Sequence, residues 1–177
     1  KEQRALHDLV GDAQRAALAQ ARPGIAYDAG HQAAVETLTE GLLRLGLLKG
    51  KLEKAIADGL YRRFYRHKTG HWLGLDVHDV GEYRLDGESR LLEPGMVFTI
   101  EPGLYVAPDD TSVAAKWRGI GIRTEDDVAI TADGHRVLTD ALVRDADEIE
   151  QHGQGMAVEG HGAAGDVAPG HFHLSST

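Results

Sequence analysis

The chain has 177 residues, a formal net charge of −9 and no cysteine. Its length is sufficient for one domain with a buried core, and a hydrophobic share of 42% indicates a globular chain rather than a disordered one. The acidic balance argues against nucleic acid or an anionic membrane as the main partner, while the lack of cysteine excludes disulfides and thiolate metal ligands.

Apolar residues recur at helical spacing in three segments of the first third of the chain. The expected helices cover residues 2–22, 29–45 and 52–60. Pro23-Gly24 is expected to end the first helix and Gly46 the second, because proline and glycine both disfavour continuation of a helix.

After residue 64 the chain changes to short apolar runs separated by glycine and proline, which predicts a sheet with loops. The expected strands lie near residues 72–77, 96–101, 104–106, 119–130 and 135–139, and a closing helical turn is expected at 145–151. Helices followed by strands predict an α+β domain whose helices cover one face of the sheet.

The composition shifts again from about residue 152. Glycine, alanine and histidine dominate, lysine and arginine are absent, and no periodicity remains. We therefore expect one domain at 1–151 and a flexible Gly/His-rich tail at 152–177. The histidines of this tail could bind metal adventitiously, but a flexible tail is the simpler interpretation of the composition.

Two glutamates occur in apolar runs, where a charged side chain is costly. Glu101 ends one expected strand and Glu125 lies inside another, and a carboxylate in such a strand needs a cation or metal as its partner. Because side chains alternate along a strand, Arg123 and Glu125 share one face. If the two charged faces converge, two carboxylates and a guanidinium meet in one pocket. The alternative is a salt bridge on a solvated strand face.

Three histidines, His67, His71 and His78, precede these glutamates. The first two have the spacing of the helical zinc-protease motif, but that motif needs a glutamate where Lys68 stands, so we reject it. His71 and His78 would face opposite sides of an unbroken strand, so a bend near Gly74 must intervene if both line one site. A single histidine is usually structural, but with three in one short segment, beside Trp72 and Asp79, a metal ligand and a structural role are both open.

Imidazole and carboxylate together indicate a metal-dependent hydrolase, with one of the three histidines and the two glutamates, Glu101 and Glu125, as three ligands. Two divalent ions that share a nucleophile need more carboxylates than these two, and no further pair stands out. The sequence contains no phosphate-binding loop and no nucleophile elbow. The chain is therefore expected to hold only part of a metal site.

Four blocks of sequence, in order, resemble the Xaa-Pro aminopeptidases (aminopeptidase P) of the pita-bread metallopeptidases. The blocks are 71–81, 93–105, 116–127 and the trailing strand with Thr131, and the match covers roughly residues 1–150. The run His71-Trp72-Leu73-Gly74 favours aminopeptidase P over prolidase. The resemblance implies the C-terminal part of a pita-bread catalytic domain, an incomplete α+β fold with helices packed on a curved antiparallel sheet.

The resemblance also implies a metal site. His71 and Glu101 would bind one divalent ion, and Glu125 would bridge two. The ions would be Mn(2+), with Co(2+) or Zn(2+) as alternatives. Members of the family carry two further aspartate ligands on a hairpin that would precede Lys1, so the full dinuclear site is expected to need upstream sequence or a companion chain.

The implied reaction is hydrolysis of the N-terminal Xaa-Pro bond of a peptide with proline at its second position. His67 and His78 would line the substrate pocket and stabilise the tetrahedral intermediate. Arg123 would help to hold the substrate, and Glu101 could accept the proton of the nucleophile. Prolidase activity and a non-enzymatic pita-bread module that binds peptides are the alternatives.

The location and assembly of the protein are expectations of the same kind. No apolar run approaches the ~18 residues that span a bilayer, and no secretory signal is visible, so we expect a cytoplasmic protein. The family implies a homo-oligomer. Because the sequence opens with Lys1 rather than methionine, we interpret it as a natural fragment, a processed product or a shortened form.

Overall fold

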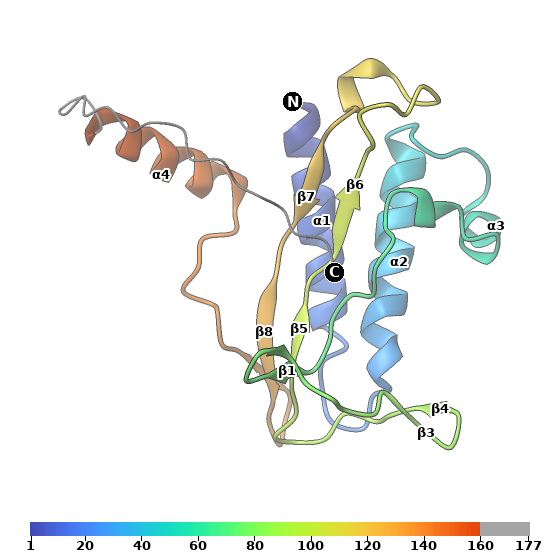
Figure 1. Cartoon of the computed structure of the whole chain (residues 1–177), viewed down its shortest axis with the longest axis vertical. Helices are drawn as coiled ribbons and strands as arrows, with labels where there is room; N and C mark the ends of the chain where they lie inside the picture. Colours follow the sequence, from blue (N-terminus) through green and yellow to red (C-terminus); the bar gives the residue numbers. More distant parts are fainter. Residues whose placement is uncertain (160–177) are drawn as a thin grey trace, which may run out of the picture.

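The computed structural model describes residues 1–159 of the chain. Two long helices, α1 (Glu2–Leu18) and α2 (Tyr27–Arg44), lie side by side, and α1 contacts the strands that follow (Figure 1). Helix α3 (Leu52–Ala57) and the 3₁₀ turn η1 (Leu60–Arg63) complete the helical part. No helix within the described range has the length and apolar character needed to cross a membrane.

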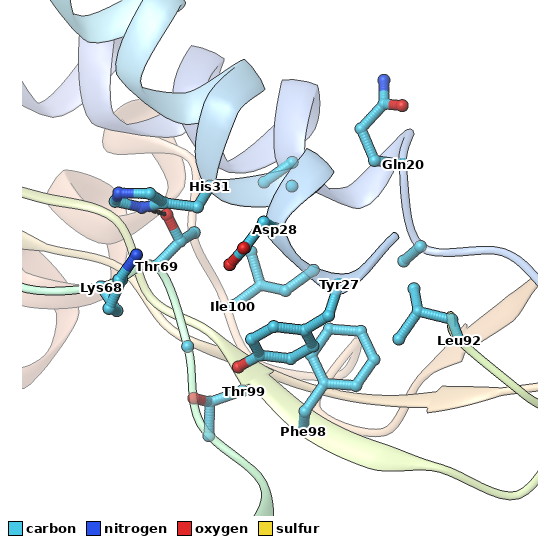
Figure 2. A pocket seen from close by; sticks show the side chains of 14 residues that line it. Gln20, Tyr27, Asp28, His31, Lys68, Thr69, Leu92, Phe98, Thr99 and Ile100 are labelled. Carbon is cyan, nitrogen blue, oxygen red and sulfur yellow. Dashed lines mark hydrogen bonds between the residues drawn. The ribbon is translucent and has the colours of Figure 1, made fainter. Parts of the chain in front are cut away.

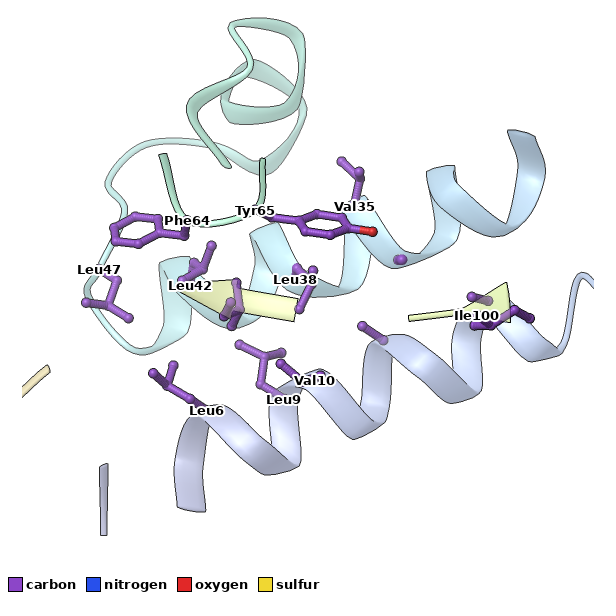
Figure 3. Packing of buried hydrophobic residues seen from close by; sticks show 14 of the residues in the cluster. Leu6, Leu9, Val10, Val35, Leu38, Leu42, Leu47, Phe64, Tyr65 and Ile100 are labelled. Carbon is purple, nitrogen blue, oxygen red and sulfur yellow. The ribbon is translucent and has the colours of Figure 1, made fainter. Parts of the chain in front are cut away.

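The contact between α1 and α2 forms the centre of the core (Figure 3). Its fully or almost fully buried side chains include Leu6, Leu9, Val10, Leu38 and Leu42. Gly41 of α2 allows the helices to approach closely, since a Cβ at this position would overlap the side chain of Leu9. A glycine inside a helix costs about 1 kcal/mol relative to alanine, so close packing explains its place here.

The sheet is an antiparallel ribbon of two interrupted strands. Strands β5 (Val97–Ile100) and β6 (Gly103–Tyr105) follow each other along one side, and β7 (Gly121–Arg123) and β8 (Asp126–Ile130) along the other. Strand β5 pairs with β8, and β6 pairs with β7. β9 (His135–Val137) adds to the outer side of β8, and the 3₁₀ turn η2 (Ala115–Trp117) precedes β7.

The continuous strand predicted at 119–130 is therefore wrong, because it is broken at Thr124 and Glu125. The opposite strand is broken at Glu101 and Pro102, directly across the ribbon. Proline has no N–H to donate to a ladder. Across the break, the N–H of Thr124 donates to the carbonyl oxygen of Pro102 at 3.4 Å.

The single strand predicted at 72–77 is a tight hairpin of β1 (Leu73–Gly74) and β2 (Val77–His78). A second hairpin, β3 (Arg84–Leu85) and β4 (Glu88–Ser89), was not predicted. Its turn is Asp86-Gly87, and both residues have positive φ, at 51° and 85°. Asp-Gly is a favoured pair for such turns, so the local signal was present in the sequence.

Helix α4 (Ala146–Glu159) extends beyond the helical turn predicted at 145–151. The first residues of the tail expected from residue 152 are thus helical, and the flexibility of the tail stays a prediction. The carboxylate of Asp145 accepts hydrogen bonds from the N–H groups of Asp147 and Glu148, at 2.8 and 3.3 Å, which starts the helix. The rest of the predicted tail, 160–177, lies outside the described residues.

Candidate metal centre

The two facing breaks in the ribbon hold the two glutamates identified from the sequence. Glu101 follows the last residue of β5, and Glu125 precedes the first residue of β8. The N–H of Glu101 donates to the carbonyl oxygen of Thr69 at 2.6 Å, which attaches this break to the segment that carries His71. Glu125 was predicted to lie inside a strand, which is wrong because it lies in the break between β7 and β8, and Glu101, predicted to end its strand, comes one residue after β5.

His71, Glu101 and Glu125 converge, and each offers one ligand atom within 4.8 Å of the others. Nε2 of His71 is 3.4 Å from Oε1 of Glu101. Nδ1 of His71 lies 2.9 Å from the carbonyl oxygen of Trp72, which can only accept, so in the neutral imidazole Nδ1 carries the proton and Nε2 the lone pair. One neutral imidazole and two carboxylates are a donor set that fits a divalent cation.

The electrostatics of the cluster also favour a cation. Glu125 is exposed as a residue, yet partial burial of its carboxyl group raises its pKa above the ordinary value, and the negative charge of Glu101 raises it further. Arg123 acts in the opposite direction on this pKa. Its Nε is 3.7 Å from Oε2 of Glu101, and its side chain is half exposed. A cation between the carboxylates would relieve their repulsion.

His78 lies beside His71 because of the β1–β2 hairpin, in which Leu73 pairs with His78. The centroids of the two imidazole rings are 4.2 Å apart. The bend expected near Gly74 is present, and a Cβ on Gly74 would lie 2.6 Å from the carbonyl oxygen of His78. The hairpin thus places both rings on one side.

His67 is held apart from this cluster. Its Nε2 is 3.1 Å from the hydroxyl of Tyr105, and its Nδ1 is 2.8 Å from the carbonyl oxygen of Lys68. Within the described residues, no hydrogen bond or ion pair joins His67 to His71 or to either glutamate. A substrate role for His67 therefore stays a prediction.

Sequence reasoning missed a buried polar group on the other side of the segment that carries His71. Figure 2 shows His31 of α2 reaching Thr69 in a pocket that Tyr27 also lines. Nδ1 of His31 is 2.8 Å from Oγ1 of Thr69, and the hydroxyl of Tyr65 is 2.5 Å from the same oxygen. This network joins α2 to the loop before His71. A histidine in a helix and a threonine in a loop gave no signal of their contact.

Burial lowers the pKa of His31 to about 4, so His31 is neutral at pH 7. The unfolded chain binds a proton here near pH ~6.5, whereas the folded chain does so only near pH 4. The free energy of unfolding should therefore fall as the pH is lowered through this window.

We expect His31→Asn to weaken this pH dependence, measured by urea unfolding at about pH 7 and pH 4.5. His152→Asn, at an exposed position of α4, is the control, and an unchanged pH dependence in His31→Asn would contradict the prediction.

Comparison with known proteins identifies relatives of this chain. Residues 1–132 match metallopeptidase family M24. Xaa-Pro aminopeptidase 1 of Streptomyces coelicolor is 47% identical over 150 residues, covering 84% of this chain and 30% of that protein. Xaa-Pro aminopeptidase of Escherichia coli is 47% identical over 148 residues, with 84% and 33% covered. The structure of aminopeptidase PepP from Pseudomonas aeruginosa matches with a TM-score of 0.87 at 51% identity, covering 89% of this chain and 36% of that one. The chain thus spans about a third of the length of these relatives.

Proposed function

The chain belongs to metallopeptidase family M24, and from this we propose that it is part of an enzyme that hydrolyses the N-terminal Xaa-Pro bond of peptides. The observation that carries the proposal is the convergence of three ligand atoms within 4.8 Å. They come from a hairpin segment and from two strand breaks that are distant in sequence. The names of the relatives, Xaa-Pro aminopeptidases at 47% identity, support the choice of substrate.

The metal ligands in this proposal are His71, Glu101 and Glu125, with Glu125 between two ions. The expected ions are Mn(2+), with Co(2+) or Zn(2+) as alternatives. A divalent ion bound here would lower the pKa of a coordinated water and polarise the scissile carbonyl. The chain contributes the neutral Nε2 of His71 and two carboxylates, whose charges balance a dication.

The neighbouring side chains would act on the substrate. Glu101 would accept a proton from the attacking water, since one of its oxygens faces the ligand cluster. His78, whose ring lies beside that of His71, would donate to the oxygen of the scissile carbonyl. Arg123 would hold Glu101 in place and contact the peptide with its exposed guanidinium. His67 would line the pocket further from the metal ligands.

The proposal includes partners outside these 177 residues. A dinuclear site needs more carboxylates than the cluster contains, and two further aspartates would come from an upstream segment or a companion chain. We also propose a homo-oligomer and a cytoplasmic location. An M24 module that binds peptides without catalysis is the less favoured alternative, because a protein without catalysis has no need for all three ligands.

The test uses the full-length protein, freed of metal by chelation and then titrated with Mn(2+). We expect cleavage of Ala-Pro-Ala to appear with added metal, and Ala-Ala-Ala to remain uncut. Faster cleavage of the dipeptide Ala-Pro would indicate prolidase instead. Metal binding without cleavage of any Xaa-Pro peptide would contradict the proposed activity, and absence of metal binding would contradict the proposed site.

A further inference from the structure

Thr99 contacts two of the proposed metal ligands at the same time. It lies in β5, two residues before Glu101, and is 1% exposed. Its hydroxyl oxygen is 3.0 Å from the backbone nitrogen of His71 and 3.1 Å from Oε1 of Glu101. A single buried hydroxyl therefore joins the histidine segment to the carboxylate.

The direction of both hydrogen bonds follows from the groups involved. The N–H of His71 can only donate, so the Thr99 hydroxyl accepts there. Its one proton is then available for Glu101, whose carboxylate can only accept. Hydrogen bonds to a charged group are the stronger kind. The oxygen that accepts this proton is also the one that lies 3.4 Å from Nε2 of His71.

The backbone of Thr99 strengthens the same link. Its N–H donates to the carbonyl oxygen of His71 at 2.9 Å, so both backbone polar groups of His71 are bound to Thr99. Gly70 lets the His71 segment and β5 approach this closely, because a Cβ on Gly70 would overlap the carbonyl oxygen of Thr99. Of the three ligands, His71 and Glu101 are thus both fixed to one residue of β5.

We propose that Thr99 is a positioning residue of the metal centre, which orients the Glu101 carboxylate and the His71 segment for binding a divalent cation. The proposal rests on the metal site in the proposed function. Without the hydroxyl, Glu101 would lose the donor that fixes one of its oxygens, while repulsion from Glu125 would remain. The N–H of His71 would also lose its partner. Substitution of a residue that hydrogen-bonds to a metal ligand typically weakens metal binding by about 10–100-fold.

The test compares Thr99→Val with Thr99→Ser in the full-length protein. Valine keeps the size and β-branching of threonine and removes the hydroxyl, whereas serine keeps the hydroxyl. The readout is the dissociation constant for Mn(2+), measured by titration of the metal-free protein, with circular dichroism as the check of folding. We expect Thr99→Val to bind Mn(2+) at least about 10-fold more weakly than the parent protein. Thr99→Ser should stay close to the parent value.

Thr39→Val is the matched control. Thr39 is also fully buried, and its hydroxyl donates to the carbonyl oxygen of Val35 within α2 at 2.6 Å. We expect its Mn(2+) affinity to be unchanged. Equal weakening in Thr39→Val and Thr99→Val would show a general packing effect and overturn the proposal.

Two further outcomes are informative. If the parent protein binds Mn(2+) and Thr99→Val binds it equally well, the positioning role is wrong while the proposed metal site stands. If the parent protein binds no divalent cation, both fail together. Thr99→Ala and Thr99→Ser differ mainly by the hydroxyl, so this pair repeats the comparison if the valine variant does not fold.

Discussion

Glu125→Ala is expected to abolish peptide hydrolysis by the full-length protein and to weaken Mn(2+) binding by more than about 100-fold. Loss of a residue that only hydrogen-bonds to a metal ligand already weakens binding by up to about 100-fold, so loss of a ligand should weaken it more. The substitution removes one of the three converging ligand atoms that would hold the metal in the proposed site. The measurement is a metal titration together with a rate assay on an Xaa-Pro-Xaa peptide.

The same variant should not destabilise the metal-free fold. Partial burial and the charge of Glu101 raise the pKa of Glu125, so its ionised form is disfavoured in the folded chain. We therefore expect metal-free Glu125→Ala to unfold in urea at the same concentration as the parent protein or a higher one. Glu36→Ala, an exposed glutamate on α2, controls for loss of one negative charge. Full activity of Glu125→Ala with saturating metal would refute the assignment.

Gly70→Ala is expected to disrupt both folding and metal binding. The added Cβ would overlap the carbonyl oxygen of Thr99 and lie 2.9 Å from its carbonyl carbon. These are backbone atoms of β5, which cannot turn aside as a flexible side chain can. Overpacking in a buried region typically costs about 1–3 kcal/mol. We expect a loss of at least that size in urea unfolding, and weaker binding of Mn(2+).

Gly134→Ala is the control for this substitution. A Cβ at Gly134 has no heavy atom within 4 Å, and its φ is not in the left-handed region. It should leave stability and metal affinity almost unchanged. If Gly70→Ala behaves in the same way, the close approach of the His71 segment to β5 does not set the geometry of the site.

The fold class was predictable from the sequence, and the similarity to aminopeptidase structures confirms the α+β, pita-bread assignment. The helices at 2–22 and 29–45 were predicted because their apolar residues recur every three or four positions. The strands were predicted less well, since short apolar runs do not show where a ladder changes partner. The break at Thr124 and Glu125 lies opposite Glu101 and Pro102, a pairing that no local pattern shows.

The candidate ligands were also visible in the sequence, because carboxylates in apolar runs and clustered histidines are unusual. Their supporting contacts were less visible. Thr99 and Glu101 are two residues apart, which places them on the same face of an extended strand, so their contact could be anticipated from the spacing alone. The link from Thr99 to His71 and the link from His31 to Thr69 join residues far apart in sequence, for which no local pattern exists.

By itself, the sequence determined where the two long helices lie, which side chains are apolar, and which groups can bind a cation, since these depend on local periodicity and on side-chain chemistry. Only the tertiary structure decided that His71, Glu101 and Glu125 meet, and that His67 does not join them. The reason is that the meeting point depends on the pairing of two broken strands and on the closeness that Gly70 allows. Both are relations between distant segments, and packing sets them rather than local preference.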